Sequence, residues 1–291
     1  MTKNTADNFS LTPSNAEAAD SNLTQSNVSI DPWAQLKKFT RARIALGRVG
    51  SSLPTREVLD FGLAHAMARD AVHLALDVDA LETAIQAQGF STIRVHSRAP
   101  DRANYLLRPD WGRRLDDNSL MDLTGISSLK KSNAKPIDLL IVVADGLSSL
   151  AVSRHVLPML AEIRQLLPAD WQLGPVVIAS QARVAIGDEI GQALNARMVA
   201  MLIGERPGLS SPDSLGIYLT YQPTLGLSDA DRNCISNVRP EGLQYAAAAK
   251  KLLWLAGQAM RLKLSGVALK DESDVQEIAQ PSTAEIEQAP K

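Results

Sequence analysis

The stretch Ile137-Asp138-Leu139-Leu140-Ile141-Val142-Val143 decides the fold class of this chain. A short, nearly continuous run of branched aliphatic residues is typical of a strand that is buried on both faces of a parallel sheet. An Asp-Gly pair at residues 145–146 follows the run, and a helical pattern extends from residue 150 to residue 167. A buried strand, a turn and a helix in this order form the first half of a parallel α/β unit.

The same rhythm repeats further along the chain. Residues 175–179 and 198–203 are two more buried strand patterns, with a helix expected over 186–195 between them. Residues 217–221 are a fourth strand pattern, and a long amphipathic helix is expected over 242–264. Strands that alternate with helices predict an α/β fold with a doubly wound, mainly parallel sheet.

The chain before the sheet reads as helical. A helix is expected from the Asp31-Pro32 start to about residue 47, because Asp can cap a helix and Pro is tolerated in its first turn. After a break at residues 51–54, Thr55 starts a second helix. A third is expected over 79–88, ended by Gly89.

Composition divides the chain into four parts. Fourteen of the first thirty residues are Ser, Thr or Asn, which predicts a disordered tail over residues 1–30. Residues 31–90 form the helical N-terminal region, and residues 91–268 form the α/β domain. Residues 269–291 contain six acidic and two basic residues, which predicts a solvated acidic tail.

Several classes of protein are excluded by charge and cysteine content. A formal net charge of −2 and an aromatic fraction of 4% disfavour a nucleic-acid partner, because neither a basic field nor stacking platforms are present. A single cysteine, Cys234, rules out an internal disulfide and a thiolate-rich metal site. No apolar run is long enough to span a membrane, and the first residues lack the apolar core of a signal peptide. We therefore expect a cytoplasmic protein.

Small and polar residues follow three of the predicted strands. These loops are residues 145–149, 180–184 and 204–208, and in such a sheet ligands bind beyond the carboxyl ends of the strands. Each loop alone is equally well explained by ordinary turn chemistry. Their coincidence at three strand ends favours a ligand site.

The sequence contains no recognisable catalytic constellation. It lacks the glycine-rich phosphate loops, the H-E-x-x-H zinc motif and the G-x-S-x-G nucleophile elbow. Asp145, Ser148 and His155 superficially suggest a hydrolase, but Ser148 lacks the elbow motif. His65 and His73 lie two helical turns apart, too far for one metal ion, so with Arg69 they form a polar stripe that faces solvent or a partner subunit. We assign no catalytic residue and no metal ligand.

Eight segments, taken together, resemble one protein family. In chain order they are residues 43–48 (RIALGR), 62–66 (GLAHA) with 69–70 (RD), 105–110 (YLLRPD), 112–115 (GRRL), 145–148 (DGLS), 183–186 (RVAI) with 190–191 (IG), 204–209 (GERPGL) and 231–237 (DRNCISN). The chain resembles the small (light) subunit of ethanolamine ammonia-lyase from about residue 33 to residue 265. The segments at 204–209 and 231–237 are the most specific.

The resemblance implies a function that composition could not reveal. In that family a large and a small subunit hold adenosylcobalamin between them, and the holoenzyme converts ethanolamine and related vicinal amino alcohols to acetaldehyde and ammonia by a radical mechanism. The large subunit carries the chemistry, and the Rossmann-like small subunit holds the nucleotide side of the cofactor. The resemblance thus implies a hetero-oligomer in ethanolamine degradation whose small subunit is inactive alone. It leaves encapsulation in a bacterial microcompartment open, since residues 1–30 show no amphipathic addressing helix.

The family's cofactor contacts correspond to Val184, Glu205 and Cys234. The resemblance implies that Val184 lines the cofactor, that the Glu205 carboxylate accepts hydrogen bonds from corrin amides or a ribose hydroxyl, and that Cys234 packs against the cofactor. A salt bridge with a nearby arginine is the alternative role for Glu205, and a small buried apolar residue is the alternative for Cys234. For the whole chain, the alternative is a scaffold protein of the same fold that has lost the cofactor.

Overall fold

The computed structural model describes residues 32–40, 42–129 and 136–273. The chain divides into two compact units, Met1–Leu63 and Ala64–Lys291. The predicted tail at residues 1–30 lies outside the described residues, and so does the predicted acidic tail from residue 274 onward. The second unit contains the sheet, and the site lies within this unit.

The described part of the first unit has little regular structure. A 3-10 helix, η1, spans Pro32–Lys38, so the prediction of a helix that continues to about residue 47 is wrong. Ala45 and Gly47 have φ values of 51° and 76°, in the left-handed region that a right-handed helix cannot contain. The unit then enters helix α1, where Glu57 forms an ion pair with Lys37 (3.6 Å).

The second and third predicted helices are confirmed. Helix α1 spans Thr55–His73, and helix α2 spans Val78–Ala87. The Asp77 carboxylate caps α2 by accepting a hydrogen bond from the Ala80 amide (3.0 Å), and Gly89 (φ 82°) follows its end, as expected for a helix stop.

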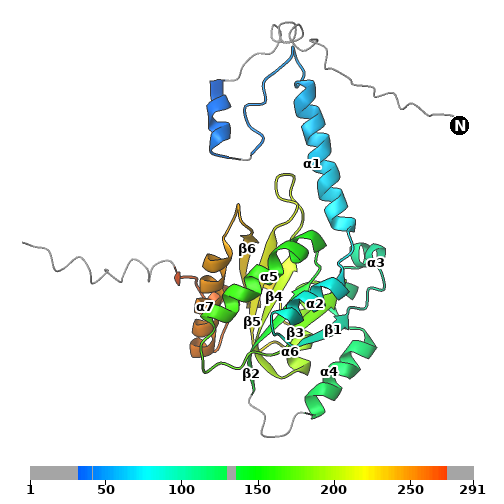
Figure 1. Cartoon of the computed structure of the whole chain (residues 1–291), viewed down its shortest axis with the longest axis vertical. Helices are drawn as coiled ribbons and strands as arrows, with labels where there is room; N and C mark the ends of the chain where they lie inside the picture. Colours follow the sequence, from blue (N-terminus) through cyan, green and yellow to red (C-terminus); the bar gives the residue numbers. More distant parts are fainter. Residues whose placement is uncertain (1–31, 41, 130–135, 274–291) are drawn as a thin grey trace, which may run out of the picture. The chain divides into compact units, whose positions relative to one another are not determined.

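Six strands of the described chain form one mixed sheet in the order β1-β3-β2-β4-β5-β6 (Figure 1). The first four strands run parallel to one another, and the last two add an antiparallel extension to β4. The strands are β1 (Thr92–His96), β2 (Ile137–Ala144), β3 (Val176–Ser180), β4 (Ala196–Gly204), β5 (Leu215–Tyr221) and β6 (Arg232–Val238).

Helices cover both faces of this sheet. Every residue of β2 is therefore buried, and its side chains alternate between two hydrophobic cores. Leu139, Ile141 and Val143 face α2, α5 (Ser149–Leu166) and α7 (Tyr245–Leu262). Leu140 and Val142 face α4 (Asp117–Leu129) and α6 (Ile186–Ala193). The shorter elements are α3 (Arg102–Leu107), η2 (Trp111–Arg113), η3 (Asp229–Asp231) and η4 (Gly266–Ala268).

Every strand and helix predicted after residue 135 is present, as β2 to β5 and α5 to α7, but the sheet is not wholly parallel. Strand β5 runs antiparallel to β4 because only residues 205–214 connect them. A parallel crossover needs a dozen or more residues, usually with a helix. Strands β1 and β6 and helices α3 and α4 were not predicted, and Cys234 lies in β6.

Candidate functional site

A cavity of about 480 Å³ lies beyond the carboxyl ends of β2, β3 and β4. This size is within the range of roughly 300–1,000 Å³ that small-molecule sites occupy. The three loops that the sequence places after these strands meet at this cavity. Its wall consists of Tyr105, Arg113, Gly146, Leu147, Arg183, Val184, Ala185, Ile203, Gly204, Glu205, Arg206, Tyr218 and Asp229.

Two glycines allow the β2 and β4 loops to touch. The Leu147 amide donates a hydrogen bond to the Gly204 carbonyl (2.9 Å). A Cβ atom on Gly146, which has a φ of 58°, would lie 2.2 Å from that carbonyl oxygen, and a Cβ on Gly204 would lie 2.0 Å from the Ser148 carbonyl oxygen. Because no side chain fits at either position, glycine is required there, and this contact fixes one wall of the cavity.

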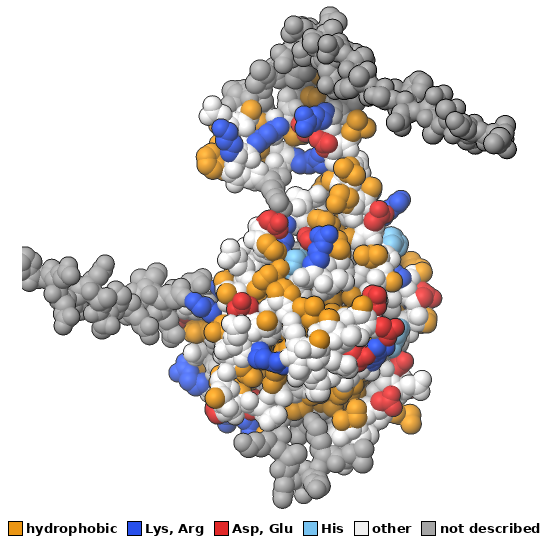
Figure 2. All heavy atoms as spheres, viewed as in Figure 1, with side chains coloured by type: hydrophobic (Ala, Val, Ile, Leu, Met, Phe, Trp, Pro, Cys, Tyr) orange, Lys and Arg blue, Asp and Glu red, His pale blue; other side chains and the backbone are white. Residues whose placement is uncertain are grey.

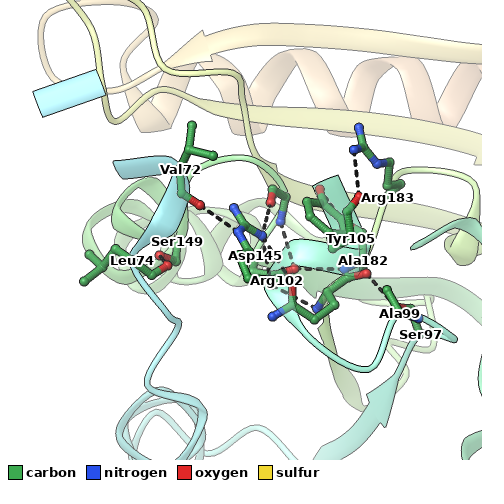
Figure 3. A network of polar contacts seen from close by, with 12 residues as sticks. Val72, Leu74, Ser97, Ala99, Arg102, Tyr105, Asp145, Ser149, Ala182 and Arg183 are labelled. Atoms are coloured by element: carbon green, nitrogen blue, oxygen red, sulfur yellow. Dashed lines mark hydrogen bonds and ion pairs between the residues drawn. The ribbon is translucent and has the colours of Figure 1, made fainter. Parts of the chain in front are cut away.

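The buried carboxylate of Asp145 ties the β2 loop to the β3 loop (Figure 3). It accepts hydrogen bonds from the main-chain amides of Gln181 (2.9 Å), Ala182 (2.9 Å) and Gly146 (3.0 Å). Burial raises the pKa of Asp145, while the three amides and Arg102, 3.5 Å away, favour its charged form. Asp145 therefore holds the two loops together. Both of its carboxylate oxygens are engaged by these donors, unlike those of a free catalytic acid.

Arg102 links this loop junction to the end of α1. Its Nε donates to the Val72 carbonyl (2.6 Å), and its Nη1 donates to the Gly146 carbonyl (2.9 Å) (Figure 3). Its guanidinium carbon also lies 4.6 Å from the centre of the Tyr105 ring. One side chain thus connects a cavity-lining glycine, an aromatic wall residue and the C-terminal turn of α1.

Glu205 lies in the cavity wall, held by a hydroxyl and a main-chain amide rather than by an arginine. Its Oε2 accepts a hydrogen bond from the Ser214 hydroxyl (2.6 Å), and both oxygens lie 3.3 Å from the Asn237 amide nitrogen. Among the described residues no arginine forms an ion pair with Glu205, so the structure there does not show the salt-bridge alternative. A carboxylate offers about four acceptor sites, so these two donors leave acceptor capacity on a half-buried side chain.

Val184 and Cys234 occupy different positions relative to the cavity. Val184 is half-buried and lines it, together with Glu205. Cys234 is exposed on β6 and does not belong to the wall, but it pairs across the sheet with Tyr218, which does. The alternative of a buried apolar cysteine is thus wrong. Partial burial raises the pKa of the Cys234 thiol, and its hydrogen bond with Tyr218 opposes that shift.

The three residues that suggested a hydrolase serve separate structural roles. The Ser148 hydroxyl donates to the Pro212 carbonyl (2.8 Å), and Asp145 is bound to main-chain amides. His155 Nδ1 forms its hydrogen bond with the Tyr245 hydroxyl (2.8 Å). These contacts do not connect a nucleophile to a base, so they form no catalytic triad.

Sequence reasoning did not assign several wall residues to the site. Tyr105 and Arg113 come from the unpredicted segment between β1 and β2, and Asp229 lies in η3. Tyr218 was placed in a strand but not in the site, although its position next to a predicted ligand loop is a usable signal. Tyr105 and Arg113 lie in the family-matched segments 105–110 and 112–115, which could have identified them, whereas Asp229 carries no local pattern.

A family model described as the ethanolamine ammonia-lyase light chain matches residues 30–270. The chain belongs to the ethanolamine ammonia-lyase light-chain family. The ethanolamine ammonia-lyase small subunit of Pseudomonas fluorescens Pf0-1 is 57% identical over 247 residues, which are 84% of this chain and 89% of that protein. The Pseudomonas putida W619 subunit is 56% identical over 255 residues (87% and 93%), and the Xanthomonas campestris subunit is 57% identical over 245 residues (84% and 89%).

Family membership makes this light chain a subunit of a carbon–nitrogen lyase, as the sequence resemblance implied. Across residues 32–40, 42–129 and 136–273, no three His, Cys, Asp or Glu side chains gather in a way that could hold a metal ion. Within the same ranges, no helix has the length and apolar character needed to cross a membrane.

Proposed function

We propose that this light chain holds the nucleotide side of adenosylcobalamin in the cavity beyond the carboxyl ends of β2, β3 and β4. This cavity belongs to the Rossmann-like domain, residues 91–268, and would lie at an interface with a large catalytic subunit. The holoenzyme would deaminate ethanolamine and related vicinal amino alcohols to acetaldehyde and ammonia in ethanolamine degradation. The observation that carries the proposal is that Val184 and Glu205, from two separate family-matched loops, line the same cavity.

The residues of the wall suit part of a corrinoid. The molecule is larger than a cavity of about 480 Å³, so one portion would lie inside and the rest would extend beyond the mouth. Leu147, Val184 and Ile203 offer apolar contact, and Glu205 offers an acceptor for amide or hydroxyl donors. A site with apolar walls and a few placed polar groups is typical of cofactor binding.

Each residue of this chain would bind or orient rather than react. When bound, adenosylcobalamin supplies a radical through homolysis of its cobalt–carbon bond. Glu205 would fix the orientation of the corrinoid through hydrogen bonds, and the Val184 methyl groups would exclude water from the cavity. Cys234 would pack at its edge beside Tyr218. The acid–base and radical-handling groups would then belong to the large subunit.

We expect the purified light chain to show no ethanolamine deamination when it is supplied with adenosylcobalamin alone. Its cavity wall contains binding groups but no nucleophile paired with a base, which is the physical reason for the expected result. Ammonia release would be measured for the chain alone and after reconstitution with the large subunit. Turnover by the light chain alone would contradict the assignment of the chemistry to the partner.

Helix α1 is the proposed docking element for the large subunit, within residues 31–90. Large apolar side chains are exposed along it, and Figure 2 colours hydrophobic side chains orange. They are Val58 (52% exposed), Leu59 (67%), Phe61 (48%), Leu63 (63%) and Met67 (51%). A concentration of exposed apolar side chains on one helix favours burial against a partner. The polar stripe of His65, Arg69 and His73 on the same helix is exposed as well.

Arg69→Glu is expected to weaken assembly with the large subunit while the fold remains intact. The Arg69 side chain is 71% exposed and its ion pair with Asp70 spans 3.7 Å at the surface, so its loss should scarcely affect stability. Co-purification and thermal melting would be compared for this variant and for Arg261→Glu, an exposed arginine on α7. If Arg69→Glu co-purifies with the large subunit as well as the unmodified chain does, the stripe is only a solvent-exposed face and takes no part in docking.

A further inference from the structure

Three arginines, Arg113, Arg183 and Arg206, line the cavity. In the described part of the chain, no carboxylate lies within ion-pair distance of any of the three. The two acidic residues of the wall are engaged elsewhere, because Asp229 lies 3.6 Å from Arg232 and Glu205 binds Ser214 and Asn237. With three arginines against the two carboxylates of Glu205 and Asp229, the cavity wall carries a formal net charge of +1.

Arg183 is held in a fixed position. Its main-chain amide donates to the Gly112 carbonyl (2.8 Å), and its guanidinium carbon lies 4.5 Å from the centre of the Tyr105 ring. Its Nη2 donates to the Tyr105 carbonyl (3.2 Å), as Figure 3 shows. A Cβ atom on Gly112 would come within 2.9 Å of Arg183 Cγ, so the glycine makes room for this side chain.

The Arg183 guanidinium also has unused hydrogen-bonding capacity. Its Nε is shielded from water and has no hydrogen-bond partner in the structure. A cation that is partly withdrawn from water and incompletely hydrogen-bonded is unfavourable by itself, and an anion beside it removes that cost. Burial of Tyr105 raises its pKa to about 12, so its hydroxyl stays neutral and does not supply the anion near neutral pH.

Arg113 and Arg206 complete the arrangement from two other elements. Arg113 ends η2, and Arg206 lies in the connection between β4 and β5, and both are exposed where they line the cavity. Arginines from three separate parts of the chain thus converge on one space. Guanidinium groups bind phosphate oxygens in paired hydrogen bonds, so convergent arginines are typical of phosphate recognition.

We infer that the cavity contains a phosphodiester subsite formed by Arg183 with Arg113 and Arg206. The inference rests on the proposed function, because adenosylcobalamin carries one phosphodiester, in the loop that joins its corrin ring to its nucleotide. The subsite specifies which end of the cofactor enters the cavity. Arg183 supplies the fixed cation, and the two exposed arginines add charge at the mouth.

The test uses the double variant Arg113→Gln/Arg206→Gln in complex with the large subunit. Both side chains are exposed, so the fold should tolerate the change. Equilibrium dialysis, read by corrinoid absorbance, would give the Kd of adenosylcobalamin, of adenosylcobinamide phosphate, and of adenosylcobinamide, which lacks phosphate and nucleotide. We expect the first two Kd values to rise by about 10- to 100-fold and the third to stay constant. Arg261→Gln, with the same charge change on α7, should alter none of them.

Several results would overturn the subsite. One is an equal loss of affinity for all three corrinoids, which would mean that the arginines contact the corrin amides. Another is an unchanged Kd for all three. If the unmodified complex binds no corrinoid, the proposed function fails, and calorimetry with inorganic phosphate then tests the subsite separately. Phosphate binding that is lost in the double variant would support an anion site, and no phosphate binding by the unmodified complex would overturn it.

Discussion

Replacing Asp188 by alanine is expected to lower the free energy of unfolding by about 3–5 kcal/mol. The two Asp188 oxygens accept hydrogen bonds from Arg232 Nη1 (2.5 Å) and Nη2 (2.8 Å), and both side chains are almost completely buried. The pair joins α6 to the edge strand β6. Its removal leaves a guanidinium group in the interior without its carboxylate, and the cost of that buried charge is the source of the large effect.

Urea unfolding measures this prediction, with an unchanged slope as evidence that only stability has changed. Asp229→Ala is the matched control, because Asp229 also lies near Arg232 (3.6 Å) but is 87% exposed. Its loss should change stability by no more than about 0.5 kcal/mol. Replacing the pair together, as Asp188→Leu/Arg232→Met, should recover much of the loss. An Asp188→Ala midpoint equal to that of the unmodified chain would show that the pair contributes no stability.

Glu205→Ala is expected to raise the Kd of the assembled enzyme for adenosylcobalamin by about 10- to 100-fold, since hydrogen bonds to charged groups contribute about 1.5–3 kcal/mol. Activity at saturating cofactor should fall less, because the reacting groups would lie on the large subunit. Glu205→Gln keeps one acceptor oxygen and should lose less affinity than the alanine variant. Activity titrated against cofactor concentration gives the Kd for each variant.

The structure also predicts a stability cost for Glu205→Ala, which must be separated from the loss of affinity. The substitution removes the acceptor for the Ser214 hydroxyl and the Asn237 amide. Ser214→Ala removes one of those structural bonds and keeps the carboxylate, so it should lower the melting temperature with little change in Kd. An unchanged Kd in Glu205→Ala would remove Glu205 from the cofactor site and leave it with a structural role.

The part of the fold that could be predicted depends on local patterns. The run at residues 137–143 is buried on both faces, so its composition alone identifies a central strand of the sheet. The sequence also predicted that three loops lie close together, because parallel strands place their carboxyl ends at one edge of the sheet. These are residues 145–149, 180–184 and 204–208. That rule predicted the place of the cavity without any knowledge of side-chain contacts.

The parts that could not be predicted depend on contacts between distant residues. Strand β6 contains Arg232, Asn233, Cys234, Ser236 and Asn237, which do not form an apolar strand pattern. Its first residue is buried only because Asp188, 44 positions earlier, neutralises it. The direction of β5 was missed for a different reason, since a buried strand has the same composition whether its neighbour is parallel or antiparallel.

The strand order β1-β3-β2-β4-β5-β6 also has a consequence for the route by which the chain folds. Strands β4, β5 and β6 pair with their neighbours in sequence, so their contacts close short loops at a small entropic cost. Strand β1 pairs with β3 only after the intervening chain, which includes β2, has been enclosed. We expect the antiparallel ribbon to form early and β1 to dock late. The segment between β1 and β2, which carries Tyr105 and Arg113, would then be the last part of the cavity to acquire its native structure.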